Sequence, residues 1–353
     1  MNLKELNMGG MIAKIPIIQG GMGIGVSLSG LAGAVAREGG VGVISAAQPG
    51  YMLPEWAKRP LRANLEALAQ HIGLARKKKQ EGLVGVNIMC AARNYEDYVK
   101  CAVDSEADVI ISGAGLPINL PELVSGAATK VAPIVSSVKA AKVLLKLWDK
   151  RYGKTADMVV VEGPKAGGHL GFSLEELEAD AKGERNFDDE LTGIMDMVGQ
   201  YENKYNRNIP VVFGGGVYDR QDILRYIGMG CAGVQMATRF VVTEECDASD
   251  AFKQAYIQAK KEDIGIVKSP VGMPGRAITN RFVRNTNESR EPVSHCYACL
   301  SHCDSQTTPY CISQALVNAV KGDLDNGLIF CGDSAHRVDR MTTVRALFKE
   351  LSE

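Results

Sequence analysis

The chain has 353 residues, of which 46% are hydrophobic and 23% charged, a composition typical of a folded globular protein. Its 40 lysines and arginines balance 41 aspartates and glutamates, and this net charge of −1 gives no reason to expect a nucleic-acid or anionic-membrane partner. No run of about 18 apolar residues is present, which argues against a membrane span. The first residues contain no apolar segment, so we expect a cytoplasmic protein without a secretory signal.

Short apolar or β-branched runs that end in small residues predict eight strands. They span Ile15–Ile18, Val41–Ser45, Val84–Met89, Asp108–Gly113, Val131–Ser137, Met158–Glu162, Pro210–Phe213 and Gly233–Phe240. Amphipathic stretches between most of them predict helices over Ser29–Glu38, Leu61–Gln80, Tyr95–Ser105, Ser137–Tyr152, Asp188–Tyr205 and Arg220–Gly228. Continuous apolar runs are typical of parallel strands. Eight strand–helix units therefore favour an α/β fold, the closed (β/α)8 TIM barrel, over an open doubly wound sheet.

Two segments exceed a minimal barrel. Phe172–Asn186 is highly charged and is interpreted as either a mobile lid or a solvated loop. We assign residues 1–285 to the barrel and residues 286–353 to an extension that packs on it and ends in a helix over Met341–Leu351.

Glycine-rich turns directly follow four of the predicted strands, at Gln19–Gly25, Ser112–Gly115, Glu162–Gly171 and Gly214–Gly216. Glycine lets backbone N–H groups approach an anion or a flat ring without a Cβ clash. In such barrels the loops after strands seven and eight often hold a phosphate, and here these are Gly214–Gly216 and Gln235–Arg239. The pattern predicts a phosphorylated cofactor or substrate, although tight turns alone would also use glycine. The spacing within Gly21–Gly25 lacks the third glycine of a Rossmann fingerprint.

His169 is the one histidine in a glycine-rich turn at a strand end. Histidine titrates near pH 6.5 and can exchange a proton with a substrate at neutral pH. We therefore predict a catalytic role for His169, the alternative being a histidine that only bonds the backbone of its own loop.

Four of the nine cysteines lie close together in the extension, as Cys296-x2-Cys299-x3-Cys303-x7-Cys311. In a cytosolic protein such clustering suggests metal ligation more than disulfides. Four thiolates suit a [4Fe–4S] cluster or a tetrahedral zinc ion, and the sequence leaves these two and free thiols open. His295 and His302 flank the group as spare ligands.

Several motifs together resemble the nitronate monooxygenase family (formerly 2-nitropropane dioxygenases), a sister of the FMN-dependent enoyl-acyl-carrier-protein reductases. The most specific are Ala166-Gly167-Gly168-His169 and Gly233-Val234-Gln235-Met236-Ala237-Thr238-Arg239-Phe240. The others are Pro16-Ile17-Ile18-Gln19-Gly20-Gly21-Met22, Gly85-Val86-Asn87, Gly113-Ala114-Gly115, Val135-Ser136-Ser137, Glu162-Gly163 and Gly214-Gly215-Gly216.

The resemblance implies an FMN-binding TIM barrel. The flavin ring would lie against Gly20, Gly21 and Met22 with Asn87 near its polar edge. The phosphate would sit on Gly215 and Gly216 and on the turn Gln235–Thr238, and His169 matches the position that relatives use near the flavin and substrate. The cofactor-binding positions carried over are Gln19, Gly20, Gly21, Met22, Asn87, Gly113, Ser137, Glu162, Gly167, Gly168, Gly214, Gly215, Gly216, Gly233, Gln235, Met236 and Thr238.

The implied activity is oxidation of a small nitronate or related carbon acid over the flavin, with His169 as base or hydrogen-bond donor. An alternative is NAD(P)H-dependent reduction of an enoyl thioester C=C bond through FMN. A third hypothesis is a non-catalytic flavin and iron–sulfur module for electron transfer or redox sensing. Lys165 stands where relatives usually carry an acidic residue, which favours an anionic substrate or is only a surface contact. If the chain forms an oligomer, we expect a homodimer.

Overall fold

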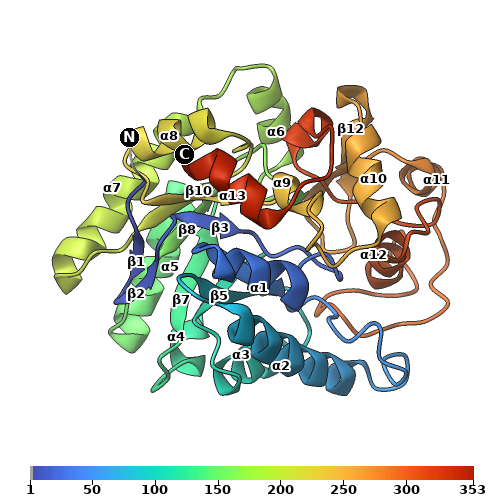
Figure 1. The fold of residues 1–353 in the computed structure, drawn as a ribbon. Helices are drawn as coiled ribbons and strands as arrows, with labels where there is room; N and C mark the ends of the chain where they lie inside the picture. The colour runs from blue at the N-terminus through green and yellow to red at the C-terminus, as the bar shows by residue number, and fades with distance from the viewer. Residues whose placement is uncertain (1–2) are drawn as a thin grey trace.

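The computed structural model describes residues 3–353 and has a closed barrel of eight parallel strands at its centre (Figure 1). The barrel is closed by pairing between its first and last strands, which excludes the open sheet. The strands are β3 (Ile17–Gln19), β4 (Val41–Ser45), β5 (Leu83–Met89), β6 (Val109–Gly113), β7 (Lys130–Val135), β8 (Val159–Glu162), β10 (Val211–Gly214) and β11 (Gly233–Met236). All eight predicted strands are present. The last is shorter than predicted, because the chain turns at Ala237 into α9 (Thr238–Val241).

Helices follow the strands around the outside of the barrel. They are α1 (Ser29–Arg37), α2 (Pro60–Lys78), α3 (Tyr95–Asp104), α4 (Leu120–Leu123), α5 (Val138–Tyr152), α7 (Phe187–Tyr205) and α8 (Arg220–Gly228). Helix α5 shows why these segments are helical. The Ser137 side chain caps its N-terminus, Gly153 ends it in the left-handed conformation, and a buried stripe that includes Leu144 and Trp148 faces the barrel. No helix within residues 3–353 is long and apolar enough to cross a membrane.

The barrel interior is filled at one end, so the site can lie only at the other. Fully buried side chains such as Ile18, Val109 and Val160 fill the interior. A hairpin of β1 (Leu6–Met8) and β2 (Met11–Ala13) contributes Leu6, Met8 and Ala13 to the same cluster. The turns after the strands leave the barrel at the opposite end, which therefore stays accessible.

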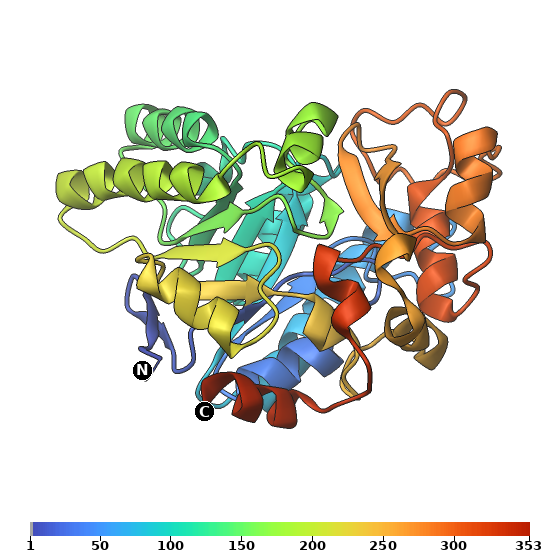
Figure 2. The same ribbon diagram turned by 90° about the horizontal axis from the view of Figure 1, so that it is seen from above.

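The chain after β11 builds a second layer to one side of the barrel, drawn in orange in Figure 2. Apart from the terminal helix α13 (Val344–Ser352), which is drawn in dark red beside the barrel helices, the layer contains α10 (Asp250–Gln258), the 3-10 turn η1 (Lys261–Asp263), β12 (Ile264–Lys268), β13 (Pro274–Ile278), α11 (Arg281–Glu288), α12 (Ile312–Lys321) and the 3-10 turn η2 (Asp333–Arg337). Val267, Phe282, Leu300, Tyr310 and Leu328 form a separate hydrophobic cluster within it. Helix α13 packs against α1 and α8.

The charged segment Phe172–Asn186 contains a helix and is not an irregular loop. Helix α6 spans Leu174–Ala181 and begins with a capping box in which Ser173 and Glu176 bond each other's backbone. Just before it, β9 (Gly168–His169) pairs with β13 and joins the small sheet β12–β13–β9. This pairing attaches the predicted catalytic histidine to the layer outside the barrel.

Candidate active site

A cavity of about 440 Å³ lies at the carboxyl ends of the strands. It brings together most of the predicted site residues, from six different strand ends. Those that line it are Gly20, Gly21, Met22, Asn87, Gly113, Glu162, Gly167, Gly168, His169, Gly214, Gly215, Gly216, Gln235, Met236 and Thr238. The predicted glycine-rich turns therefore converge on one opening.

Three predicted cofactor-binding residues do not line this cavity, and each packs or bonds elsewhere. The Gln19 side chain is fully buried and exchanges two hydrogen bonds with the backbone of Val43, at 3.1 and 3.2 Å. The Ser137 hydroxyl accepts a hydrogen bond from the N–H of Ala140 and caps α5. Gly233 lets β11 approach β3, since an added Cβ would lie 2.5 Å from the carbonyl oxygen of Pro16. A motif shared with a family therefore does not show which of its residues pack or bond elsewhere and which contact the cofactor.

The turn after β10 offers bare backbone of the kind that a phosphate requires. Gly215 has φ +128° and Gly216 has φ +85°, conformations that other residues rarely adopt. A Cβ on Gly215 would lie 2.8 Å from the carbonyl oxygen of Gly163. The start of α9 at Thr238 lines the cavity as well. These residues fit the phosphate of FMN through a cradle that any larger side chain would fill.

The cavity wall at the end of β3 also depends on glycine. A Cβ on Gly21 would overlap the side chain of Asn87, and one on Gly20 would press on Gln235 at 3.3 Å. The first strand end therefore lies directly against two amide side chains that line the cavity. This arrangement leaves backbone without a Cβ beside two amide groups, which fits a flavin ring.

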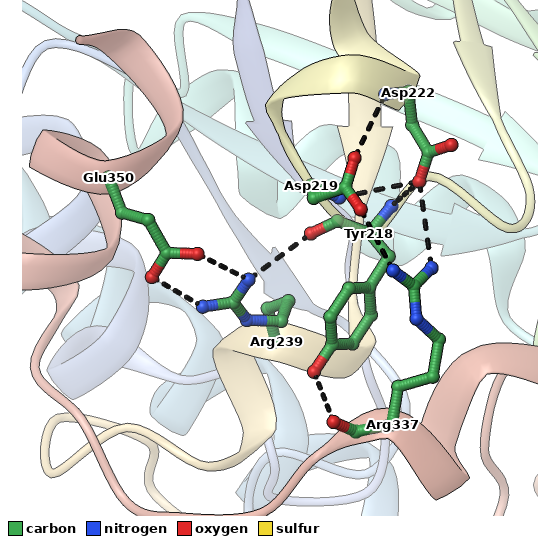
Figure 3. Close-up of polar contacts among 6 residues, drawn as sticks. All are labelled: Tyr218, Asp219, Asp222, Arg239, Arg337 and Glu350. Atoms are coloured by element: carbon green, nitrogen blue, oxygen red, sulfur yellow. Dashed lines mark hydrogen bonds and ion pairs between the residues drawn. The ribbon is translucent and has the colours of Figure 1, made fainter.

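A charged cluster ties together the two turns that would hold the phosphate (Figure 3). Arg239, on α9, makes a bidentate pair with Glu350 of α13 at 2.8 and 2.9 Å. Its guanidinium also lies over the ring of Tyr218, which follows the Gly214–Gly216 turn. Arg337 stacks on the same ring and bonds Asp219 at 2.8 Å. The C-terminal segment thus supports both turns from outside the barrel.

His169 is held by the hairpin β12–β13. Its partner in the β9–β13 pairing is Gly275, and its Nε2 lies 2.7 Å from the Oγ of Ser269. The ring of Phe330 packs edge-on at a centroid distance of 4.9 Å. Burial lowers the pKa of His169 to about 4, so its imidazole is neutral at physiological pH.

Glu162, at the end of β8, is a second titratable group in the cavity wall. Its Oε2 accepts a hydrogen bond from the N–H of Gly171 at 2.8 Å. Burial raises the pKa of this carboxyl to about 7, while the Gly171 hydrogen bond and the nearby Arg276 guanidinium lower it. Arg276 donates to the carbonyl oxygens of Pro164 and Ala166, and so braces the loop that carries both titratable groups.

Sequence reasoning missed Ser269, Arg276 and Phe330. All three lie more than 100 residues after the end of β8, and only the fold brings them to the cavity. The single signal was the Pro/Gly-rich stretch around Arg276, which shows a turn but not its partner. Lys165 is exposed and lies beside the Gly216 turn, where an added Cβ would be 3.0 Å from its own Cβ.

The four clustered cysteines are all free. Cys296 is exposed, whereas Cys299, Cys303 and Cys311 are half-buried. Burial raises the pKa of Cys299 to about 11, and the thiols of Cys311 and Cys303 add to this shift. Within residues 3–353 no three Cys, His, Asp or Glu side chains form a group that could hold a metal ion, so the geometry does not support the predicted metal ligation.

Comparison with known proteins decides the family. The model of the nitronate monooxygenase family matches residues 5–353. The chain belongs to that family. It is therefore an FMN-dependent oxidoreductase, as the sequence predicted.

Individual relatives of this nitronate monooxygenase family member share about a quarter of its residues. A probable nitronate monooxygenase of Staphylococcus saprophyticus is 27% identical over 346 residues, which cover 92% of this chain and 89% of the relative. A 5-hydroxy-7a-methyl-1-oxo-octahydro-1H-indene-4-carboxyl-CoA dehydrogenase of Rhodococcus jostii is 26% identical over 274 residues, which cover 78% of this chain and 65% of the relative. The structure of FabK from Thermotoga maritima superposes with a TM-score of 0.70 at 26% identity, covering 95% of this chain and 91% of that one.

Proposed function

We propose that the protein oxidises a small alkyl nitronate or related carbon acid over FMN. The observation that carries this proposal is His169, a neutral imidazole in the wall of a glycine-lined cavity beside the cradle for the phosphate. Bound FMN would supply the two-electron redox chemistry. The backbone at Gly215 and Gly216 would anchor its phosphate, and His169 would exchange a proton or hydrogen bond with the substrate.

Anaerobic mixing tests the substrate directly. An alkyl nitronate added to the flavin-loaded enzyme should bleach the flavin absorbance, and oxygen should restore it. His169→Ala should keep its flavin but lose turnover by about a hundredfold or more, the usual loss on removing a proton-exchanging or charge-stabilising side chain. Failure of nitronate to bleach the flavin would contradict the substrate while leaving the flavoprotein assignment intact.

The second candidate is NAD(P)H-dependent reduction of an enoyl thioester. It is favoured by the apolar wall that the layer outside the barrel gives the cavity, formed by Met273, Leu316, Leu328 and Phe330. A relative that acts on a CoA thioester adds support. NAD(P)H oxidation that requires crotonyl thioester and ignores nitronate would select this reaction.

A [4Fe–4S] cluster at Cys296, Cys299, Cys303 and Cys311 remains our prediction, ahead of zinc. In its favour, Cys296 and Cys303 are close enough to raise the pKa of Cys311, and a cubane cluster spaces its thiolates more widely than a single ion does. Iron, acid-labile sulfide and zinc should be measured after anaerobic purification, with Cys299→Ser as the comparison. Absence of all three would leave free thiols.

Two further predictions concern the protein in the cell. We expect a cytoplasmic location and a homodimer, which cell fractionation and light scattering after size-exclusion chromatography would check.

A further inference from the structure

Ser269 contacts the proposed catalytic side chain from the layer outside the barrel. It follows β12, in the turn that leads to β13, and its Oγ is 2.7 Å from His169 Nε2 across 100 residues of sequence. The pairing of Gly275 with His169 and the two bonds from Arg276 to the carbonyls of Pro164 and Ala166 fix the hairpin to this loop. These contacts hold the Ser269 hydroxyl against the loop that carries His169.

The hydrogen bonds of Ser269 are consistent with its hydroxyl as the donor to His169. Its Oγ accepts the N–H of Val271 at 3.3 Å. Among the hydrogen bonds of the described residues, His169 Nε2 is the one acceptor that the Ser269 hydroxyl meets. A neutral imidazole carries one hydrogen, so a ring whose Nε2 accepts must carry its hydrogen on Nδ1.

The second ring nitrogen is open to the cavity. Nδ1 of His169 has no hydrogen-bond partner among residues 3–353, and it is not one of the fully buried polar atoms without a partner. Since His169 lines the cavity, this nitrogen is accessible from it. Its low pKa keeps the ring neutral at neutral pH, so only one of its two nitrogens carries a hydrogen at a time.

We propose that Ser269 is a positioning residue that fixes His169 as the Nδ1–H tautomer, so that the histidine presents a hydrogen-bond donor and not a base to the flavin cavity. The inference deepens the proposed function and rests on it for the role of His169. A donor suits a substrate that arrives with its negative charge already on oxygen, as a nitronate does. A neutral nitroalkane would need a base to remove its proton, which an Nδ1–H imidazole with an occupied Nε2 cannot supply.

Nitrogen NMR of the flavin-loaded protein tests the tautomer without relying on turnover. The chain has five histidines, so long-range ¹H–¹⁵N spectra of histidine-labelled protein remain simple, and His169→Gln identifies the signal. We expect a protonated Nδ1 and an unprotonated Nε2 at pH 7. A protonated Nε2, or protonation of both nitrogens, would overturn the proposal even if nitronate turns over.

The role of Ser269 is tested with a pair of variants. Ser269→Ala should give a mixed tautomer signal and lower kcat/KM for nitronate about tenfold, the factor expected for one hydrogen bond. Ser269→Thr keeps the hydroxyl and should restore both. Flavin content and thermal unfolding show whether each variant is folded.

The outcomes separate the two proposals. If Ser269→Ala leaves the ring signals of His169 unchanged, Ser269 does not set the tautomer. If the signals change but nitronate never bleaches the wild-type flavin, the positioning role stands and the proposed substrate fails. A wild-type enzyme that turns over neutral nitroalkane as fast as nitronate would overturn the assignment of His169 as a donor.

Discussion

At the scale of single residues, burial shifts the pKa values of Glu162 and His169 in opposite directions. The carboxyl pKa rises to about 7 and the imidazole pKa falls to about 4. Both shifts favour the neutral form, because a buried charge loses its hydration. These two side chains therefore add little negative charge to the cavity near pH 6, which suits a site for an anionic cofactor tail.

The raised pKa of Glu162 predicts how stability depends on pH. Between its ordinary value of 4.5 and about 7 the folded state holds a proton that the unfolded state has released, so stability falls as pH rises through this window. Glu162→Gln keeps an acceptor for Gly171 and lacks the titration. We expect flavin-free Glu162→Gln to gain roughly 2 kcal/mol over wild type between pH 4.5 and 7.5.

Urea unfolding at several pH values measures this difference. The lowered pKa of His169 acts with the opposite sign, adding stability as pH rises from about 4 to 6.5, but it is common to both proteins and cancels in the comparison. A difference that stays constant with pH would mean that the Glu162 carboxyl is not perturbed.

How far the sequence predicts the site also depends on the residue. His169 and the glycines at 214–216 could be placed at the cavity because such residue types are unusual at a strand end. Gln19 and Gly233 lie in the same motifs but serve packing, a distinction that only neighbouring atoms reveal. Ser269 could not be found, since a lone serine in a turn gives no sign of the histidine that it meets.

At the scale of elements, glycine sets how closely a helix can lie on the barrel. An added Cβ on Gly42 of β4 would overlap the backbone of Ala32 in α1. Gly42→Ala should therefore destabilise the protein by about 3 kcal/mol or more, because backbone on both sides leaves nothing to move aside. Thermal or urea unfolding would measure it.

Gly73 provides the matched control. It lies inside α2, and a Cβ there would meet nothing within 4 Å. Gly73→Ala should stabilise the protein by about 0.5–1 kcal/mol, since alanine loses less backbone entropy in a helix. Equal effects of the two substitutions would show that β4 and α1 do not pack this closely.

The link between α9 and α13 should act on the cofactor. Arg239 is only 13% exposed and holds Glu350 through two bonds, whereas lysine can offer only a point charge. We expect Arg239→Lys to loosen the turns that carry Gly216 and Thr238 and to weaken FMN binding about fivefold, the factor for roughly 1 kcal/mol. Fluorescence titration of the apoprotein would measure the Kd.

Arg345→Lys serves as the control for that titration. Arg345 lies on the same α13 but is 79% exposed, and its pair with Glu38 spans 3.5 Å. Exposed pairs of this kind contribute little, so FMN affinity should not change. A similar loss in both variants would point to α13 as a whole and not to the Arg239–Glu350 pair.

The main elements follow from sequence pattern, and the small ones do not. The barrel strands are continuous apolar runs, which predict a parallel sheet covered by helices on both faces, and eight of them favour its closed form. Strand β9 is two residues long and β12 alternates weakly, so neither shows a period that can be read in advance. Their sheet forms because β13 meets the loop after β8, a contact between segments about 100 residues apart in the chain.

At the scale of the whole molecule, the proposed cofactor bridges the closure of the barrel. The cavity is lined by the ends of β3, β5, β8, β10 and β11, and the register that joins the first strand to the last pairs Met236 with Gln19. A ligand that contacts residues on both β3 and β11 can bind only when these strands are paired and the barrel is closed. It should therefore stabilise the entire fold and not one loop.

FMN and riboflavin separate the phosphate from the ring in this effect. A ligand present at 100 times its Kd stabilises the folded state by about 2.7 kcal/mol, and weaker ligands add less at the same concentration. At equal concentration FMN should raise the Tm of the apoprotein clearly more than riboflavin. In Gly216→Ala, whose φ of +85° and close Lys165 side chain disfavour a Cβ, the advantage of FMN should largely disappear while riboflavin behaves as before. If riboflavin matches FMN in the wild-type protein, the phosphate does not bind at the turn after β10.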